Sequence, residues 1–527
     1  MLVANGINTP MGRYPNEGYL TYQSFTRNSI TSSSLNSAEA NWTGAVAVIR
    51  KNNWITDRDT VTAHSGNTLT HTANSIYNGI NNYGFFIQND PKTLDRQNEW
   101  YYNSSTKKLQ MYSAGMPANI RVSTIDVLVS IKGTDNITFS NLSFTGSNKA
   151  AFAVNFSHHV RILHCAINFS GMNAIITRGG KCGYFQLVNS FIDHTNNNAI
   201  DLGGASENCL LSYDTIKNTG LFAGMGVSAD KTYTAIKTDS DNGVVENCFV
   251  DSTGYLGIDF YGNNTIIRNN LVSNFCMTKF DGGGIYTFIR IGGKPSKGEQ
   301  LLNNIVVNGI GNVAGTTQKI PLVHGIYLDE GTANVEIAGN TVANNSYSGL
   351  YYHSSYNNNV HNNTFYNNGY AQVLIADYNA TDPDRNLKLK NNVFVSKTAT
   401  QRTASFQSGA NDIPSFGKAT DVDSNFYLRP MDDSKTIETA VKNYEVTTQR
   451  TLAAWQAYSG FDAHSSRSSF TAKNANDVRF EYNEKGVNKT IALDANYVDI
   501  NNTAHTGTIT LAPYSSVILI KNGTISR

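Results

Sequence analysis

A repeated unit between Asn136 and Phe394 is the feature that most limits how this 527-residue chain can fold. Each unit begins with a short apolar segment, passes an asparagine-rich corner and returns to a second segment of the type Gly/Ala-Ile-x-apolar. Units recur about every 22 to 25 residues where no loop is inserted, and a unit of that size cannot bury its apolar face alone. Successive units must therefore stack into a solenoid. The opening segments are 137–144, 185–192, 244–250, 266–272, 335–342 and 387–394.

The pattern inside each unit favours strands over helices. Apolar residues alternate with polar ones over short runs, without the longer apolar period of a helix. Asparagine recurs at one corner of successive units, where stacked side-chain amides can hydrogen bond to one another and to the turn backbone. We therefore predict an all-β chain built on a parallel β-helix. The asparagines of this corner are Asn270, Asn304, Asn340, Asn363 and Asn392.

The regions on both sides of the repeats have different patterns. Residues 1–125 are expected to form a β-rich segment that caps the solenoid, and residues 126–400 the catalytic β-helix itself. Residues 401–460 are polar and are expected to form a loop-rich connection with a short helix at 452–458. Residues 461–527 are expected to form a small β-module on the end of the solenoid, where it would cover unpaired strand edges.

Charge and cysteine usage narrow the possible partners. The chain has 41 basic and 40 acidic residues and no block of like charge, which speaks against a nucleic-acid partner. It also lacks an apolar run of about 18 residues, so no membrane partner is expected. The cysteines form no metal-binding pattern and are predicted to be free, buried residues, and the sequence leaves the oligomeric state open. The cysteines are Cys165, Cys182, Cys209, Cys248 and Cys276.

Four segments together carry a family resemblance: Gly12–Asn16, Leu94–Tyr102 followed by Leu109, Asp281–Tyr286 and Leu511–Leu519. In these segments the chain resembles secreted bacterial carbohydrate-active enzymes that fold as right-handed parallel β-helices. The resemblance implies a glycoside hydrolase that acts on a poly- or oligosaccharide without a cofactor, with polysaccharide lyases as wider relatives. It also implies a secreted or periplasmic location, although the chain begins without the basic and apolar parts of a signal peptide.

The second strands of the units predict where a site would lie. Alternate residues of a strand point to opposite faces, so the positions between the apolar residues point outward. Aligned at the Gly/Ala-Ile motif, these positions carry carboxylates, a lysine, aromatic rings and a histidine, which indicates a substrate cleft better than a solvated face. The first row is Ile176, Asp201, Lys237, Asp259, Tyr286, Tyr327 and Tyr351, and the second is Arg178, Gly203, Asp239, Tyr261, Phe288, Asp329 and His353.

Carboxyl groups on neighbouring coils suit glycoside hydrolysis, which needs one protonated and one ionised carboxyl group. Coils stack about 4.8 Å apart, so groups one or two coils apart span the separations of retaining and inverting enzymes. The three glycines after Asp281 are expected to bend the backbone and bring this side chain over the cleft, unless it only caps a turn. The predicted catalytic residues are Asp259, Asp281, Asp329 and Asp201.

Substrate binding is assigned to the rest of the two rows. Asp201 and Asp239 are alternatively expected to hold sugar hydroxyl groups. Inserted loops at 220–234, 292–300 and 311–322 are expected to form the walls of the cleft. The predicted substrate-binding residues are Arg178, Lys237, Asp239, Tyr261, Tyr286, Tyr327, Glu330 and His353, and no metal ligands are predicted.

Two other functions remain open at this point. A polysaccharide lyase would remove the C5 proton of a uronic acid, with Lys237 as the base and a cation or calcium to neutralise the carboxylate. Lys237 stands between two acids, which favours an ion pair over a free base, and only Arg178 accompanies it as a second cation on the rows. A noncatalytic carbohydrate-binding solenoid would use the same surface without cleaving its ligand.

Overall fold

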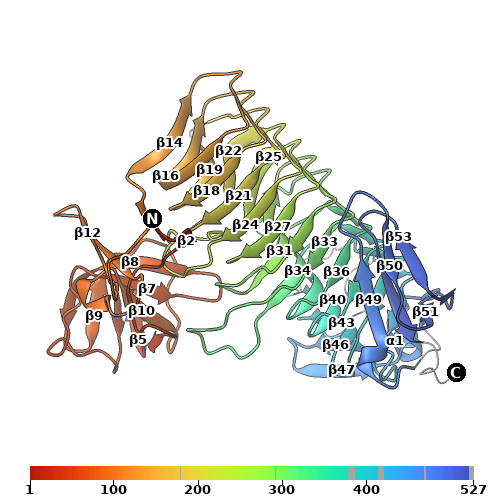
Figure 1. Cartoon of the computed structure of the whole chain (residues 1–527). Coiled ribbons are helices and arrows are strands. Elements are labelled where there is room, and N and C mark those ends of the chain that lie inside the picture. The colour runs from red at the N-terminus through yellow and green to blue at the C-terminus, as the bar shows by residue number, and fades with distance from the viewer. Residues whose placement is uncertain (179, 291, 378–385, 414–419, 468–470, 522–527) are drawn as a thin grey trace.

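Stacked parallel strands dominate the computed structural model (Figure 1), which describes the whole chain except residues 179, 291, 378–385, 414–419, 468–470 and 522–527. Most coils contribute one strand to each of three parallel sheets. We call these sheets 1, 2 and 3, in the order in which the chain meets them in a coil. The arrangement confirms the predicted all-β class and the parallel β-helix.

Sheet 1 contains the opening strands of the repeats. They are β15 (Thr138–Ser140), β17 (Arg161–Leu163), β20 (Gln186–Val188), β23 (Leu210–Ser212), β26 (Val244–Glu246), β29 (Ile266–Arg268), β32 (Gln300–Leu302), β35 (Glu336–Ala338), β38 (Asn359–His361), β41 (Lys388–Lys390) and β44 (Asp421–Asp423).

Sheet 2 follows the asparagine corner. Its strands are β18 (Ala166–Ser170), β21 (Phe191–Thr195), β24 (Thr215–Thr219), β27 (Phe249–Thr253), β30 (Leu271–Ser273), β33 (Ile305–Val307), β36 (Thr341–Ala343), β39 (Thr364–Tyr366), β42 (Val393–Val395), β45 (Phe426–Leu428) and β48 (Ser466–Arg467).

Sheet 3 holds the Gly/Ala-Ile strands. They are β14 (Ile125–Lys132), β16 (Ser143–Asn155), β19 (Asn173–Arg178), β22 (Ile200–Glu207), β25 (Ile236–Asp241), β28 (Ile258–Tyr261), β31 (Gly282–Thr287), β34 (Val323–Leu328), β37 (Ser348–His353), β40 (Ala371–Asp377), β43 (Arg402–Ser408) and β46 (Ile437–Val441). The first part of β16 also pairs with β18 of sheet 2.

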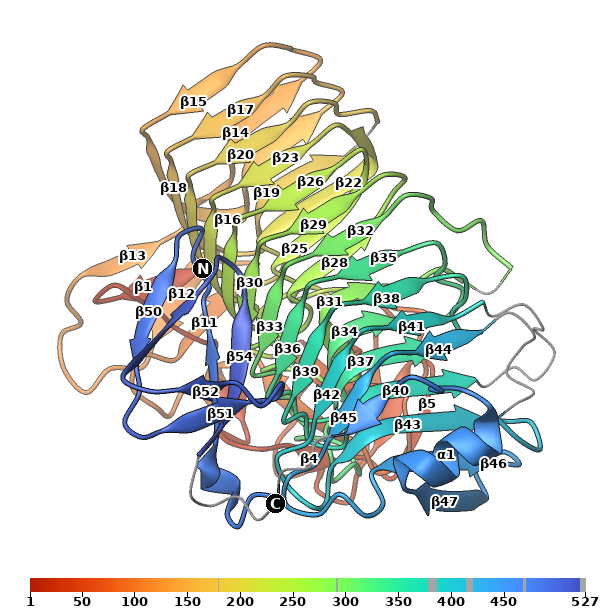
Figure 2. The ribbon, with the colours of Figure 1, turned by 90° about the vertical axis from the view of Figure 1, so that its right-hand side faces the viewer.

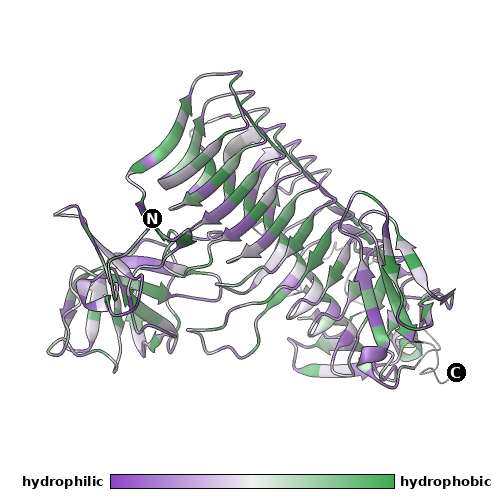
Figure 3. Ribbon diagram, in the orientation of Figure 1, coloured by the Kyte–Doolittle hydropathy of each residue, from purple (hydrophilic) through white to green (hydrophobic). Residues whose placement is uncertain are grey.

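The core lies inside the coil and is filled by several apolar side chains from each turn. Hydrophilic and hydrophobic stretches are interleaved along the coils in Figure 3. Each fully buried aliphatic side chain stabilises the stack by about 1.5 to 3 kcal/mol. The isoleucine of the Gly/Ala-Ile motif forms one such buried column, with Ile175, Ile200, Ile236, Ile258, Ile285 and Ile326 in register.

The predicted asparagine ladder is present at the corner between sheets 1 and 2. Each side-chain amide donates to the amide oxygen of the next asparagine, and these residues are fully buried, so the ladder satisfies polar groups that water cannot reach. It extends one rung beyond the prediction, to Asn425. The Nδ2–Oδ1 distances are 2.9 Å for Asn270–Asn304, 3.0 Å for Asn304–Asn340, 2.9 Å for Asn340–Asn363, 3.0 Å for Asn363–Asn392 and 3.2 Å for Asn392–Asn425.

A column of glycines lets sheets 2 and 3 approach each other in the central coils. A Cβ atom on Gly284 would lie 2.3 Å from Cγ1 of Val306, and one on Gly325 would lie 2.1 Å from Cγ1 of Val342. Earlier coils have alanine at the same place in the Gly/Ala-Ile motif, as at Ala235. The central strands of sheet 3 are therefore packed too closely for any larger residue.

The N-terminal segment forms antiparallel sheets that flank the coils (Figure 1). It differs from the expected cap, because its hydrogen bonds reach Gly224, Ser228, Thr278 and Asn312 in the middle of the chain. Its strands are β1 (Leu2–Ala4), β2 (Ile7–Asn8), β3 (Arg13–Tyr14), β4 (Leu20–Thr21), β5 (Ser24–Thr26), β6 (Ser29–Thr31), β7 (Val46–Arg50), β8 (Thr56–Ser65), β9 (Thr68–His71), β10 (Gly84–Gln88), β11 (Trp100–Asn103), β12 (Lys108–Met111) and β13 (Ile120–Val122).

The coils continue beyond residue 400, so the segment 401–460 is not the expected loop-rich connection. It supplies coil strands to all three sheets and then the antiparallel strand β47 (Val446–Arg450). The predicted helix is present as α1 (Leu452–Ser459), and its Trp455 ring stacks 4.4 Å from Phe406. Buried Trp455 therefore covers the apolar interior at this end of the coil.

The C-terminal module packs on the outer side of sheet 2 instead of the end of the solenoid (Figure 2). Its Val478, Ile518 and Ile520 share one apolar cluster with Ile305 and Tyr366 of the coils. The strands are β49 (Val478–Tyr482), β50 (Lys489–Ala492), β51 (Tyr497–Asp499), β52 (Ala504–His505), β53 (Thr508–Leu511) and β54 (Ser516–Lys521).

All five cysteines are buried and free, as predicted. Among the described residues, no helix has the length and apolar character needed to span a bilayer.

Candidate active site

Strand pairing in sheet 3 brings the predicted first row into register. Asp201 pairs with Lys237, Lys237 with Asp259, and Asp259 with Tyr286. Tyr286 continues the row to Tyr327 and, through it, to Tyr351. The alignment at the Gly/Ala-Ile motif therefore identified the correct register, because one inward isoleucine per coil fixes which residues point outward.

Outside this row lies a cavity of about 310 Å³ between sheet 3 and the N-terminal sheet, which we call the smaller cavity. It brings together predicted residues from three coils and residues that no repeat pattern contains. The lining residues are Trp54, Tyr77, Asp230, Tyr255, Asp281, Tyr286, Phe288, Tyr327, Asp329, Glu330 and His353.

Asp329 follows the end of β34 and is held in a fixed orientation by three groups. The Tyr286 hydroxyl donates to Oδ2 at 2.8 Å, and the backbone N–H of Glu330 donates to Oδ1 at 2.8 Å. Nδ1 of His353 lies 2.6 Å from Oδ1 and donates a hydrogen bond when it carries the proton. Both carboxylate oxygens therefore have donors, and the group is oriented for work on a bound molecule.

Asp281 precedes β31 and lies in a different environment. Its backbone has φ of +62°, and the following glycines allow the chain to bend there, as predicted. Burial raises the pKa of its carboxyl group to about 6, against a hydrogen bond from Asn53 that lowers it, while the charge of Asp329 raises it further and His353 lowers it. The Nδ2–Oδ2 distance to Asn53 is 3.3 Å. Asp281 therefore keeps its proton to a higher pH than an ordinary aspartate does.

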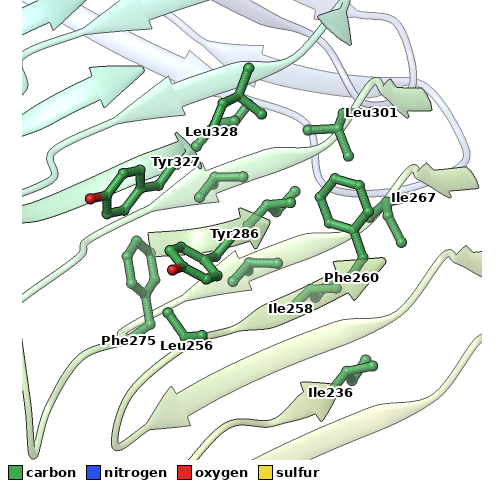
Figure 4. Packing of buried hydrophobic residues seen from close by; sticks show 14 of the residues in the cluster. Ile236, Leu256, Ile258, Phe260, Ile267, Phe275, Tyr286, Leu301, Tyr327 and Leu328 are labelled. Carbon is green, nitrogen blue, oxygen red and sulfur yellow. The ribbon is translucent and has the colours of Figure 1, made fainter. Parts of the chain in front are cut away.

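Aromatic rings form two walls of the smaller cavity. Tyr286 and Tyr327 meet edge to face with ring centroids 5.1 Å apart, and in Figure 4 both rings extend toward the same side. Loops of the N-terminal segment contribute Trp54 and Tyr77, whose ring centroids are 6.3 Å apart. Flat apolar faces beside carboxyl groups are a common composition of sites that bind small polar rings.

Asp259 is placed behind the cavity instead of on its surface. It is 1% exposed, and its Oδ1 accepts a hydrogen bond at 3.0 Å from Nζ of Lys231. Burial raises the pKa of Asp259 to about 6, against the opposing charge of Lys231. The ion pair fixes Lys231, whose Nζ lies 5.3 Å from the centroid of the Tyr286 ring.

Asp201, the fourth predicted catalytic residue, lies farther along the row and does not line the smaller cavity. It is 3% exposed and forms ion pairs with Arg178 at 2.9 Å and with Lys237 at 3.5 Å. Asp201 and Arg178 are therefore not brought together with Asp281 and Asp329.

A second space of about 870 Å³, which we call the larger cavity, adjoins the smaller one because Phe288 lines both. The predicted residues Lys237, Asp239 and Tyr261 lie here. Its lining residues are Lys181, Ser206, Glu207, Lys231, Lys237, Asp239, Asp241, Tyr261, Gly262, Asn263, Phe288, Ile289, Arg290, Gly293 and Lys294.

Two of the three inserted loops form walls of these cavities, as expected. The loop 220–234 supplies Asp230 and Lys231, and the loop 292–300 supplies Gly293 and Lys294. The loop 311–322 instead binds the N-terminal sheet, where the backbone N–H of Gly84 donates to the carbonyl of Gly315 at 2.7 Å.

Sequence reasoning missed Trp54, Tyr77, Asp230, Lys231 and Tyr255. None of them lies on the aligned strand rows, and Trp54 and Tyr77 come from the N-terminal segment. The prediction of loop 220–234 as a wall was the one signal that pointed toward Asp230 and Lys231. In the described part of the chain, no group of three or more His, Cys, Asp or Glu side chains has the arrangement of a metal site.

Comparison with known proteins agrees with the architecture. A family model described as a right handed beta helix region matches residues 127–290 and 299–412, more than half of the chain. No curated protein matches the chain.

Solved structures give a similar picture. One described as a glycoside hydrolase aligns with a TM-score of 0.52 and 14% identity, over 69% of this chain and 76% of that chain. The tailspike protein of E. coli bacteriophage HK620 in complex with a pentasaccharide aligns with a TM-score of 0.38 and 12% identity, over 77% and 82%. At 14% identity the first likeness establishes the fold alone, and the second has too low a score to carry an argument.

Proposed function

The chain belongs to the right-handed β-helix family, and from the site on sheet 3 we propose that it is a glycoside hydrolase that cleaves a poly- or oligosaccharide in the smaller cavity. The observation that carries the proposal is the pair Asp281 and Asp329. They lie on one cavity in different environments, and hydrolysis of a glycosidic bond needs two carboxyl groups of this kind.

Asp281 is the general acid in this mechanism. Its pKa of about 6 keeps it protonated in weakly acidic solution, so it can give its proton to the oxygen of the leaving sugar. The left-handed backbone at Asp281 and the hydrogen bond from Asn53 hold the carboxyl group at the cavity.

Asp329 supplies the second carboxyl group, which acts on water or on the sugar. Held by Tyr286, His353 and the Glu330 backbone, its carboxylate serves as the base that activates water or as the nucleophile that attacks the sugar. Asp259 has a positioning role, because it fixes Lys231 at the junction of the two cavities.

The aromatic walls bind the substrate. Tyr286, Tyr327 and Trp54 offer ring faces that suit the apolar faces of pyranose sugars. A solved structure of similar fold that is described as a glycoside hydrolase supports the same activity by analogy.

Two near-isosteric variants test the proposal. We expect Asp281→Asn and Asp329→Asn each to lower turnover by about 10² to 10⁴-fold, because each removes a group that transfers a proton or attacks the sugar. Release of reducing ends from a polysaccharide panel measures activity, and circular dichroism checks folding. Asp126→Asn, at an exposed ion pair with Lys149, is the control and should leave activity unchanged. Wild-type rates in both site variants would contradict the assignment.

The lyase is the second candidate, and the basic residues of the larger cavity favour it. However, Nζ of Lys237 lies 3.5 Å from Asp201 and 3.9 Å from Asp239. Because ion pairs favour the charged form of a lysine, this side chain suits substrate binding better than proton removal. A lyase product has a new double bond and absorbs ultraviolet light. Absorbance that is lost in Lys237→Ala or after calcium chelation would replace the hydrolase by the lyase, and binding without any product would indicate a noncatalytic solenoid.

A further inference from the structure

We infer that the larger cavity binds a sugar residue that carries a negative charge, either a uronate carboxylate or a sulfate ester. This inference rests on the proposed glycosidase function and names the substrate class of the same site. A cavity of about 870 Å³ beside the cleavage site has room for the neighbouring part of a sugar chain.

Five basic side chains converge on this cavity from separate segments of the chain. Lys181 follows β19, Lys231 comes from the loop 220–234, and Lys237 lies on β25. Arg290 and Lys294 come from the loop that follows β31. Only Lys237 of the five lies on a strand row. The other four come from loops that meet it only in the folded chain, so their convergence is a property of the cavity.

The acidic residues of the larger cavity already have partners. Oε2 of Glu207 lies 2.8 Å from Nζ of Lys181, and Oδ2 of Asp239 lies 3.9 Å from Nζ of Lys237. Oδ1 of Asp241 accepts hydrogen bonds from the backbone N–H and from Nδ2 of Asn263, at 2.7 and 3.1 Å. The hydrogen bonds from Asn263 orient Asp241 without neutralising its charge. The lining holds five cations against three carboxylates, and within the described residues no ion pair joins the three to the two cations that remain after Lys181, Lys231 and Lys237.

Arg290 and Lys294 are those remaining cations. Both side chains are exposed at the cavity, and neither has an ion-pair partner among the residues that the structure describes. A guanidinium group binds a carboxylate or sulfate through two parallel hydrogen bonds, and the ammonium group adds a point charge.

Phe288 connects this charge to the cleavage site. Its ring lines both cavities, two residues before Arg290, and Nζ of Lys231 lies 6.0 Å from its centroid. Tyr261, which is 40% exposed, adds a second ring to the larger cavity. A sugar stacked on these rings would present its acidic substituent to Arg290 and Lys294.

The test measures binding separately from cleavage. The full chain with Asp329→Asn, which is expected not to cleave, is titrated calorimetrically with a panel of uronate-bearing and sulfate-bearing oligosaccharides. Each is paired with its carboxyl-reduced or desulfated form. We expect at least one charged ligand to bind about tenfold more tightly than its neutral partner, with a preference that weakens at high salt. Tighter binding than the carboxyl-reduced form identifies a uronate, and tighter binding than the desulfated form identifies a sulfate ester.

Variants locate the preference. Adding Arg290→Gln and Lys294→Gln should remove it, whereas Lys297→Gln, an exposed lysine of the same loop outside the cavity, should retain it. Equal binding of charged and neutral forms, binding of neither, or a preference that survives the double substitution would overturn the inference. The proposed hydrolase fails independently, if the wild-type chain binds these ligands and releases no reducing ends.

Discussion

Burial sets the behaviour of individual carboxyl groups in this protein. Asp281, Asp259 and Glu299 all have raised pKa values because their charged forms are removed from water. They differ in what surrounds them: Asp281 faces a cavity, Asp259 faces Lys231, and Glu299 is completely buried. The same physical effect therefore suits the proposed general acid at one position and only opposes ionisation at another.

The proposed role of Asp281 as general acid predicts how activity depends on pH. A general acid works only while it holds its proton, so we expect kcat/KM to fall as the pH rises through about 6. A pH profile of reducing-end release measures this. Asp259 has a pKa in the same range, and Asp259→Asn is therefore the control. The alkaline fall should persist in that variant, and its disappearance there would assign the titration to Asp259.

The pH dependence of stability follows from Glu299. Burial raises its pKa from 4.5 to about 8, against the Ser296 hydroxyl and the Gly262 amide. A raised carboxyl pKa contributes stability below the unfolded value, and this contribution is lost as the pH rises from about 4.5 through about 8. We expect Glu299→Gln to be more stable than the wild type at the upper end by about 1 to 3 kcal/mol. Urea unfolding at both ends of the range measures the difference, and exposed Glu445→Gln should show none.

At the level of elements, the asparagine ladder holds the corner between sheets 1 and 2. Asn340 accepts from the backbone N–H and Nδ2 of Asn304, and it donates to Asn363 and to the carbonyl of Leu301. Asn340→Ala leaves these buried groups without partners, so we expect a loss of about 2 kcal/mol or more in the free energy of unfolding. Chemical denaturation measures it. Asn476→Ala, at an exposed asparagine, should change stability by less than about 0.5 kcal/mol. Equal losses at both sites would show that the ladder does not stabilise the fold.

The predicted sheet 3 rows depended on the same regularity. Each coil places one aliphatic residue of the motif inward, and a shift of one residue would expose it, so the register of the outward residues is determined locally. The ends of the strands are not fixed in this way. Asp281 and Asp329 lie just outside β31 and β34, where glycines and loops decide the direction of the side chain.

At the level of the whole molecule, the N-terminal sheet completes the smaller cavity. Arg50 is completely buried and donates to the carbonyl oxygens of Thr278, Asn312 and Asn53, at 2.8, 2.9 and 3.1 Å. These bonds join the sheet to two segments of the coil, and they lie beside Asn53 and Trp54 of the cavity wall.

Removing this anchor should therefore affect stability and activity together. We expect Arg50→Met to lower the free energy of unfolding by about 3 kcal/mol, because three buried carbonyl groups lose their donor. We also expect a higher KM, because Trp54 loses its support. Thermal unfolding and kinetics measure both effects, with exposed Arg27→Met as the control. An unchanged KM in a destabilised variant would show that this wall does not contact the substrate.

The sequence by itself determined the β-helix, the asparagine ladder and the register of sheet 3, because each follows from a pattern that repeats with every coil. Only the tertiary structure decided that Asp281 and Asp329 share a cavity while Asp201 and Asp259 do not line it. It also placed the N-terminal sheet and the C-terminal module along the sides of the solenoid and brought Trp54, Tyr77 and Lys231 to the site. These contacts join segments far apart in the chain through single side chains, and nothing in a local period records which distant surface a segment will meet.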